Sequence, residues 1–314
     1  MKSFINNDNA SKFFSSIPDN RLTGDTPLRQ IQLIMLRLLK IFDDICKKNN
    51  LRYWLIGGTL IGAVRHGGFI PWDDDVDVQM PLDDYRKFIN LPDEEFPKEV
   101  FLQTDDTDID FICPWAKLRD RFSYIEEAGG PYPYSQAAFI DIFPAVFVTE
   151  SQNKSRKWYA FLPPYNEKPE KIVKHLHFKS KIRIAVQGPL QRFFVLLLKV
   201  PFILKIFEKK YSKGEKCWEF LPPHRCPLRF KNDDIFPLKT IKFEDTEFSC
   251  PANPHNYLTC CFGDYMTPPP PEKRCSEHAV TAFYPIGPNP HFSALKWEDF
   301  YDENGNLKQG KTDE

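Results

Sequence analysis

The chain has 314 residues, of which 42% are hydrophobic and 27% are charged, close to the averages of soluble globular proteins. Its formal net charge is −1, which excludes a strongly basic nucleic-acid-binding chain. The hydrophobic and charged fractions exclude a disordered chain, a collagen and a multispan membrane protein. A chain of this length buries roughly three quarters of its unfolded surface and needs no disulfide or metal to hold a core.

The first hundred residues predict a helix followed by two short strands. Residues 1–25 are polar and are predicted to form a leader. Thr26 and Pro27 suit a helix start, because Thr favours the N-cap and Pro the first turn. Apolar residues then recur at helical spacing from Leu28 to Lys48. We expect strands at Leu51–Ile56 and Asp74–Met80, on either side of a short helix, and another helix from Pro81 to Phe88.

The rest of the chain gives weaker signals. Strand candidates are Val100–Gln103, Trp115–Arg119, Ser123–Glu126, Ala138–Phe143 and Thr240–Phe243. Residues 168–213 are predicted to be largely helical, and the Pro-rich part from Pro222 mostly loop. We therefore predict an α/β (α+β) chain with four parts: a leader (1–25), a core (26–150), a mainly helical insertion (151–235) and a loop-rich C-terminal part (236–314) that completes the site.

The most apolar segment is Phe193–Phe207, which contains Lys199, Pro201 and Lys205. It is shorter than the roughly 20 residues of a membrane-spanning helix. Two interpretations stay open: a helix that packs inside the protein, and a helix that rests on a membrane surface.

The cysteines predict a reducing compartment. Eight are present, and the first twenty residues are too polar for a secretory signal, so we predict reduced thiols and a cytoplasmic location. A zinc site is the alternative, but no CxxC occurs, and Cys275 with His278 supplies only one pair of ligands.

The clearest chemical pattern is the acidic segment Asp73–Asp77. In a strand, side chains alternate between two faces, so Asp73, Asp75 and Asp77 share one face at spacings of about 7 Å, and Asp74 lies on the other. Like charges at this spacing repel and raise each other's pKa values. A hard divalent cation such as Mg²⁺ removes that repulsion.

A second pattern, Gly57-Gly58-Thr59, stands between a predicted strand and a predicted helix. Backbone N–H groups at such a helix start form a phosphate-binding site. A glycine pair alone is weak evidence. Acidic residues at i and i+2, about sixteen residues later, make the pattern more specific, because a metal held by them can bridge to the phosphate.

The stretch GGTLIGAVRHGGFIPWDDDVDVQMP (57–81) closely resembles the signature of the LicD family, the bacterial phosphocholine-transferase group that includes fukutin and fukutin-related protein. Later segments are similar to further blocks of the family: WAKLRD (115–120), FIDIFP (139–144) and YLTCCFGDYMTPPPPEKRCSEH (257–278). The resemblance covers about residues 28–280 and constrains 145–235 poorly.

The resemblance implies a nucleotidyltransferase-type fold, with a small mixed sheet flanked by helices and a catalytic core within 26–150. It implies that Asp75, Asp77 and Asp141 are catalytic, and that Asp73, Asp75 and Asp77 hold Mg²⁺ or Mn²⁺. In the implied reaction, a hydroxyl of a cell-surface glycan or its precursor attacks the phosphate that bears choline or a polyol in a CDP-linked donor, and CMP leaves.

Other residues are expected to contact the substrates. Candidates for the donor phosphates are Gly57, Gly58, Thr59, Arg65, Lys117 and Arg119; candidates for the donor or the acceptor are Trp72, Arg274 and His278. The charged candidates Arg65, Lys117 and Arg119 can also be ordinary solvated charges, Arg274 and His278 can have structural roles, and Trp72 can be a packing residue.

Two other functions stay open. The first is a nucleotidyltransferase that acts on a small molecule and releases pyrophosphate. The second is a binding protein without turnover. For the leading function, we predict as partners a CDP-linked alcohol and a glycan acceptor, which can be lipid-linked, and no nucleic acid. The location would be cytoplasmic, with peripheral contact at the inner membrane surface if 193–207 binds lipid. The sequence does not select choline, ribitol or glycerol.

Overall fold

The computed structural model describes residues 13–104, 106–108, 111, 113, 115–127, 134–149, 215–220, 228–274, 280–287, 289, 292 and 296–308. The chain divides into two compact units. The first comprises Met1–Phe111, Trp115–Phe143 and Asp233–Glu314, and the second Ile112–Pro114 and Pro144–Asn232. The residues of the candidate site that the structure describes belong to the first unit.

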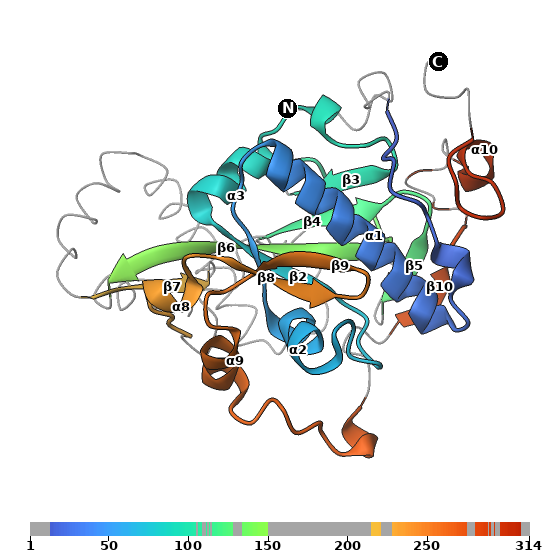
Figure 1. The fold of residues 1–314 in the computed structure, drawn as a ribbon. Helices are drawn as coiled ribbons and strands as arrows, with labels where there is room; N and C mark the ends of the chain where they lie inside the picture. The colour runs from blue at the N-terminus through green and yellow to red at the C-terminus, as the bar shows by residue number, and fades with distance from the viewer. Residues whose placement is uncertain are drawn as a thin grey trace, which may run out of the picture. The chain divides into compact units, whose positions relative to one another are not determined.

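Helix α1 (Pro27–Lys48) is the longest described helix and crosses the sheet (Figure 1). The Thr26 side chain accepts a hydrogen bond from Arg29 N, and Pro27 occupies the first turn. Its apolar face is buried, including Leu38, Leu39 and Phe42. The predicted helix is confirmed, because its caps and its apolar periodicity are both local signals.

The central sheet has the strand order β1-β2-β6-β4-β3, with β7 paired to β6. Its strands are β1 (Trp54–Leu55), β2 (Asp77–Pro81), β3 (Val100–Gln103), β4 (Ala116–Asp120), β6 (Phe139–Thr149) and β7 (Lys216–Phe220). Helices α2 (Gly57–His66) and α3 (Leu82–Ile89) precede and follow β2. The predicted mixed α/β class is confirmed. The pairing of β7 with the Ala145–Thr149 end of β6 lies within the second unit.

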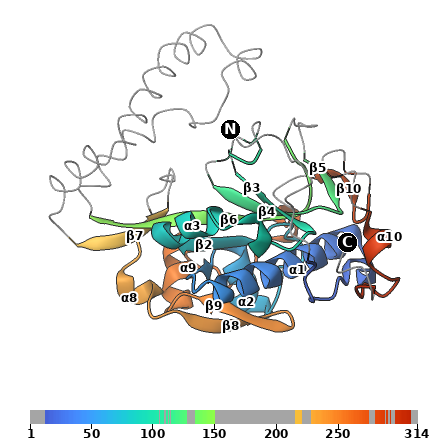
Figure 2. The ribbon, with the colours of Figure 1, turned by 90° about the horizontal axis from the view of Figure 1, so that it is seen from above.

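The C-terminal part contains more regular structure than predicted. Strands β8 (Lys239–Phe243) and β9 (Thr246–Cys250) form an antiparallel hairpin beside α1 and α2 (Figures 1 and 2). Helix α9 (Pro254–Phe262) follows, and β10 (Val280–Tyr284) pairs with β5 (Tyr124–Glu127). The short elements are η2 (Arg21–Thr23), η3 (Asp93–Glu95), α8 (Asn232–Ile235), η5 (Pro271–Lys273) and α10 (Trp297–Phe300). The predicted strand at Thr240–Phe243 corresponds to β8, and the other elements beyond Pro222 lie in a part that was predicted to be mostly loop.

The acidic strand begins later than predicted. Strand β2 starts at Asp77 rather than Asp74. The preceding residues are irregular, although Val76 O still accepts a hydrogen bond from Asp141 N at 2.8 Å. The simple alternation of faces therefore does not extend back to Asp73.

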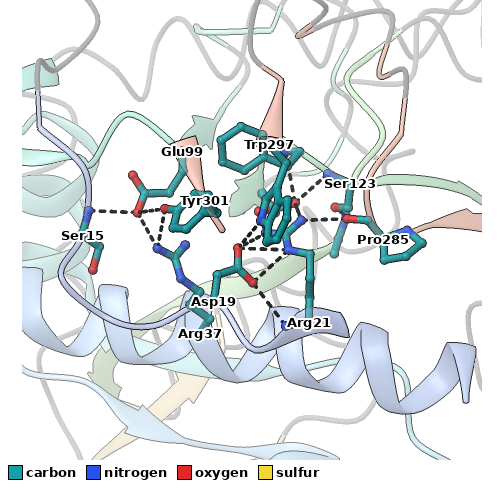
Figure 3. Close-up of polar contacts among 12 residues, drawn as sticks. Ser15, Asp19, Arg21, Arg37, Glu99, Ser123, Pro285, Trp297 and Tyr301 are labelled. Carbon is teal, nitrogen blue, oxygen red and sulfur yellow. Dashed lines mark hydrogen bonds and ion pairs between the residues drawn. The ribbon is translucent and has the colours of Figure 1, made fainter. Parts of the chain in front are cut away.

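The predicted polar leader is corrected from residue 13 onward, because charged residues there are buried in pairs. Arg21 has 0% exposure, and its guanidinium donates to the carboxylates of Asp19 and Asp120 and to Pro285 O (Figure 3). Trp297 Nε1 also donates to Asp19. The segment was predicted to be a solvated leader because it is polar, but it is part of the core, since its buried charges are paired with opposite charges.

A second ion pair in Figure 3 joins Arg37 of α1 to Glu99, with Nη2 and Oε1 2.7 Å apart. Arg37 also donates to Tyr301 Oη, and Ser15 N donates to Glu99. These contacts connect the segment before α1 with the segment around α10.

No helix in the part of the chain that the structure describes is long and apolar enough to cross a membrane. Residues 193–207 and 151–214 as a whole lie outside the described residues, so the membrane contact, the helical insertion and the cytoplasmic location stay predictions. The free cysteines within the described ranges are Cys46, Cys113, Cys217, Cys250, Cys260 and Cys261.

Candidate active site

Helix α2 begins at two glycines that face the acidic segment. Gly57 has φ 55°, a left-handed conformation that L side chains disfavour. A Cβ at Gly58 would lie 2.5 Å from Asp73 Oδ2, and a Cβ at Gly57 3.0 Å from Asp77 Oδ2. The missing side chains therefore let two carboxylates approach the N-terminus of α2, where the helix dipole favours negative charge.

Thr59 fixes the start of β2. Its buried hydroxyl accepts a hydrogen bond from the backbone N–H of Asp77 at 2.9 Å. Ile56 N donates to Asp77 O at 3.2 Å. The side chain of Thr59 thus orients Asp77, a role that its prediction as a phosphate-binding residue did not include.

Asp141 on β6 lies beside the acidic segment, as its prediction as the third carboxylate required. Its carboxylate accepts a hydrogen bond from Trp115 Nε1 at 2.6 Å. Lys117 Nζ lies 2.7 Å from Asp141 Oδ1 and 2.9 Å from Oδ2. Lys117 and Asp141 are both buried, so this ion pair is held in one orientation.

The carboxylates of the site interact strongly. Burial, then the charges of Asp75 and Asp141, raise the pKa of Asp77 well above its ordinary value, and Lys117 acts in the opposite direction. Asp73 adds a smaller effect in the same direction as the other acids. One lysine therefore faces several carboxylates, and the excess negative charge favours a bound cation.

The residues fit a magnesium-like ion. Within the described ranges, no group of three or more His, Cys, Asp or Glu side chains is placed to hold a metal by itself. Mg²⁺ is usually held by one or two carboxylates together with substrate phosphates, which matches carboxylates at a helix N-terminus. Asp74 is also buried, and its two carboxylate oxygens have no hydrogen-bond partner among the described residues.

Arginine and aromatic side chains gather at the other end of α2. Arg65 Nη1 donates to Tyr265 O at 2.7 Å, and Arg65 Nε donates to His66 Nε2 at 2.9 Å. The guanidinium carbon of Arg274 lies 5.0 Å from the centre of the Trp72 ring, a cation–π distance. Burial and then the charge of Arg274 lower the pKa of Arg65, while Asp73 acts in the opposite direction. Two guanidinium groups therefore lie near the acidic segment.

Arg119 differs from its prediction. It shares a strand face with Lys117, and both side chains contact the Phe139 ring. The guanidinium carbon of Arg119 lies 4.9 Å from the ring centre, and Lys117 Nζ lies 3.4 Å from it. However, Arg119 has 1% exposure and donates to Gln103 Oε1 and to Ala137 O. Its guanidinium supports the sheet, so we no longer assign it to the donor phosphates.

Sequence reasoning missed several residues around the site. Trp115 holds Asp141, and its signal was its place at the start of the WAKLRD block. Tyr257 of α9 is fully buried, with its hydroxyl near Trp54 and within electrostatic range of Asp77. Gln32 and Glu244 contact the segment before the acids, and no sequence signal identified them. His278 lies outside the described residues, so its predicted role stays a prediction.

Comparison with known proteins identifies the family. The chain is 30% identical over 280 residues to the protein named lipopolysaccharide cholinephosphotransferase LicD of Haemophilus influenzae, which is 82% of this chain and 97% of that protein. This chain belongs to the LicD family. The family model described as LicD/FKTN/FKRP, nucleotidyltransferase domain, matches residues 50–191. The predicted resemblance is confirmed.

Shorter stretches of the chain match two further proteins. A protein named ribitol 5-phosphate transferase FKRP of Homo sapiens is 62% identical over 34 residues, which is 11% of this chain and 7% of that protein. A protein named mannosyltransferase regulator 4 of Saccharomyces cerevisiae is 31% identical over 75 residues, 24% of this chain and 6% of that protein.

Proposed function

We propose that this LicD-type phosphotransferase moves phosphocholine or a related phosphorylated alcohol from a CDP-linked donor onto a hydroxyl of a cell-surface glycan or its precursor, releasing CMP. The names of its relatives, a cholinephosphotransferase and a ribitol 5-phosphate transferase, support this substrate class. The observation that carries the proposal is the approach of acidic side chains to the two glycines at the start of α2.

Phosphoryl transfer requires positioning and charge stabilisation more than covalent chemistry. Asp75 and Asp77, with Asp73, would hold Mg²⁺ or Mn²⁺, which would supply positive charge against the donor diphosphate. The N–H groups of Gly57 and Gly58 at the α2 N-terminus would bind a phosphate oxygen.

The proposed reaction involves two bond changes. The acceptor oxygen forms a bond to the phosphorus that bears the alcohol, and the bond from that phosphorus to the CMP oxygen breaks. The electron pair of the broken bond leaves with CMP. In the proposal, Asp141 takes the acceptor proton, and Lys117 and Trp115 keep its carboxylate oriented by their contacts.

Arg65 and Arg274 would neutralise the outer donor phosphate. Burial and then the charge of Arg274 lower the pKa of Arg65, and an anion beside the two guanidinium groups would relieve their repulsion. Trp72 already has Arg274 over its ring. A choline or cytosine that stacked on this face would therefore have to displace Arg274.

The test incubates the protein with Mg²⁺ and a panel of CDP-alcohols (choline, ribitol, glycerol) and glycan acceptors, and measures CMP. We expect CMP release with one donor, lost in Asp75→Asn and retained in the matched variant Glu303→Gln, which changes an exposed carboxylate. Pyrophosphate release from a nucleoside triphosphate would instead establish a nucleotidyltransferase. Nucleotide binding without turnover would establish a binding protein.

A further inference from the structure

The loop Gly67–Asp73 connects α2 to the acidic segment and packs tightly against α2. Gly68 N donates to Gly62 O at 3.3 Å. A Cβ at Gly62 would lie 2.4 Å from Gly68 O and 3.2 Å from Ile70 N. The backbone of the loop therefore rests directly on the helix, and its position determines where the acidic residues begin.

Glu244, in the turn between β8 and β9, contacts this loop through both backbone and side chain. Its N–H donates to Gly67 O at 2.7 Å, and its Oε1 accepts from Phe69 N at 3.2 Å. A Cβ at Gly68 would lie 2.5 Å from Oε1, so the glycine makes room for the carboxylate. Glu244 has φ 57°, an uncommon conformation for a residue with a side chain.

Helix α1 completes the enclosure of the loop. Arg29 Nη2 pairs with Glu244 Oε2 at 2.7 Å, and Arg29 Nη1 donates to Gln32 Oε1 at 3.2 Å. Gln32 Nε2 donates to Asp73 O at 3.0 Å and lies 3.4 Å from Ile70 O. One chain of hydrogen bonds thus runs from Glu244 to the backbone of the first acidic residue.

We infer that Glu244 is a positioning residue: by holding Gly67–Asp73 through Phe69 N–H, Arg29 and Gln32, it sets the acidic carboxylates at the start of α2. Glu244 is over 160 residues from the acids in sequence and touches none of their side chains in any contact described above. The inference concerns the metal and donor site of the proposed function. It rests on that function in the tests of Mn²⁺ binding and of kinetics, but not in the test of amide hydrogen exchange.

Asp245, the next residue, supplies a matched control. It pairs with Lys40 of α1, with Nζ and Oδ1 2.7 Å apart. The Asp245→Asn variant therefore removes an ion pair between the same turn and the same helix, but leaves the contacts of Glu244 with the loop unchanged.

The experiment compares Glu244→Gln and Asp245→Asn in the full chain. It measures hydrogen exchange of the Phe69 amide, the dissociation constant of Mn²⁺ by electron paramagnetic resonance, and KM and kcat for CMP release. For Glu244→Gln we expect faster Phe69 exchange and about tenfold weaker Mn²⁺ binding, the effect of losing one charge-assisted hydrogen bond. Asp245→Asn should change neither by more than about twofold. If Glu244→Gln does not fold, Arg29→Gln removes the same ion pair and should shift both values in the same direction.

Two results overturn the inference. Unchanged Mn²⁺ binding and KM in a folded Glu244→Gln variant would make Glu244 a purely structural residue. Equal shifts in Glu244→Gln and Asp245→Asn would assign the effect to general loss of stability. If the wild-type protein neither binds Mn²⁺ nor releases CMP, the proposed function fails, and the Phe69 exchange rate alone then decides whether Glu244 holds the loop.

Discussion

Replacing Asp77 with Asn should stabilise the metal-free protein while abolishing its activity. Burial and the charges of Asp75 and Asp141 raise the pKa of Asp77 well above its ordinary value. An ionised Asp77 is therefore unfavourable in the metal-free folded state. The amide has nearly the same shape and carries no charge.

The sign and size of the effect follow from proton linkage. Because the folded-state pKa is above the unfolded-state value of 3.8, the contribution of Asp77 to stability is complete below pH 3.8 and is lost as pH rises through the folded-state pKa. Each pKa unit corresponds to about 1.4 kcal/mol. At pH 7.5, the Asp77→Asn variant avoids that loss of stability. Its Tm should therefore rise by about 3 °C for each pKa unit by which the folded-state pKa of Asp77 exceeds the unfolded-state value, in a chain of this size.

The assay is thermal unfolding in EDTA between pH 5 and 8, with Glu303→Gln as the exposed-carboxylate control. The Tm difference between Asp77→Asn and wild type should grow with pH, and added Mg²⁺ with donor should raise the Tm of wild type alone. An Asp77→Asn variant that is no more stable than wild type at pH 7.5 in EDTA would refute the electrostatic reasoning.

Further predictions concern metal binding, packing and buried charge. Asp75→Ala should lower the CMP-release rate by at least about 10²-fold with the fold intact and a Tm in EDTA no lower than that of wild type; near-wild-type turnover would contradict its assignment. Gly62→Ala should lower the free energy of unfolding by about 1–3 kcal/mol in urea titrations, since its Cβ meets backbone at Gly68; an unchanged urea midpoint would mean that the loop can shift freely. Arg21→Leu should cost about 3–5 kcal/mol at pH 7, because it leaves buried carboxylates without a cation. Burial raises the pKa of Asp19, but Arg21 and Arg37 outweigh it and lower that pKa to about 2. The stability that the Arg21–Asp19 pair gives the wild type should therefore fall as pH decreases from about 4 to about 2. The Arg21→Leu variant should lack that pH dependence.

The parts of the fold that sequence predicted are those encoded locally. Helix α1 follows from its caps and apolar spacing, and Val100–Gln103 was predicted with the bounds of β3. The glycine pair and the acids were identified because strand, turn and helix signals adjoin in one short stretch. In contrast, β10 exists because it pairs with β5, far away in sequence, and Pro-rich composition does not reveal such pairing.

Site residues follow the same division. Alternation along β4 places Lys117 and Arg119 on one face, so sequence treats them alike. Their different roles come from non-local neighbours, since Asp141 lies beside Lys117, and Gln103 with Ala137 O surrounds Arg119. Glu244 was missed for the same reason, because its relation to the acidic loop exists only after the β8–β9 hairpin has packed.

The buried position of Arg21 has a consequence for synthesis on the ribosome. Its counter-charge Asp120 is made about a hundred residues later, and Pro285 O and Trp297 later still. Asp19 N also donates to Gly305 O at 3.0 Å. The segment around Arg21 therefore stays charged and solvated until the segment that contains Pro285, Trp297 and Gly305 has been made. This core can close only after those residues have left the ribosome, and the growing chain needs protection from aggregation until then.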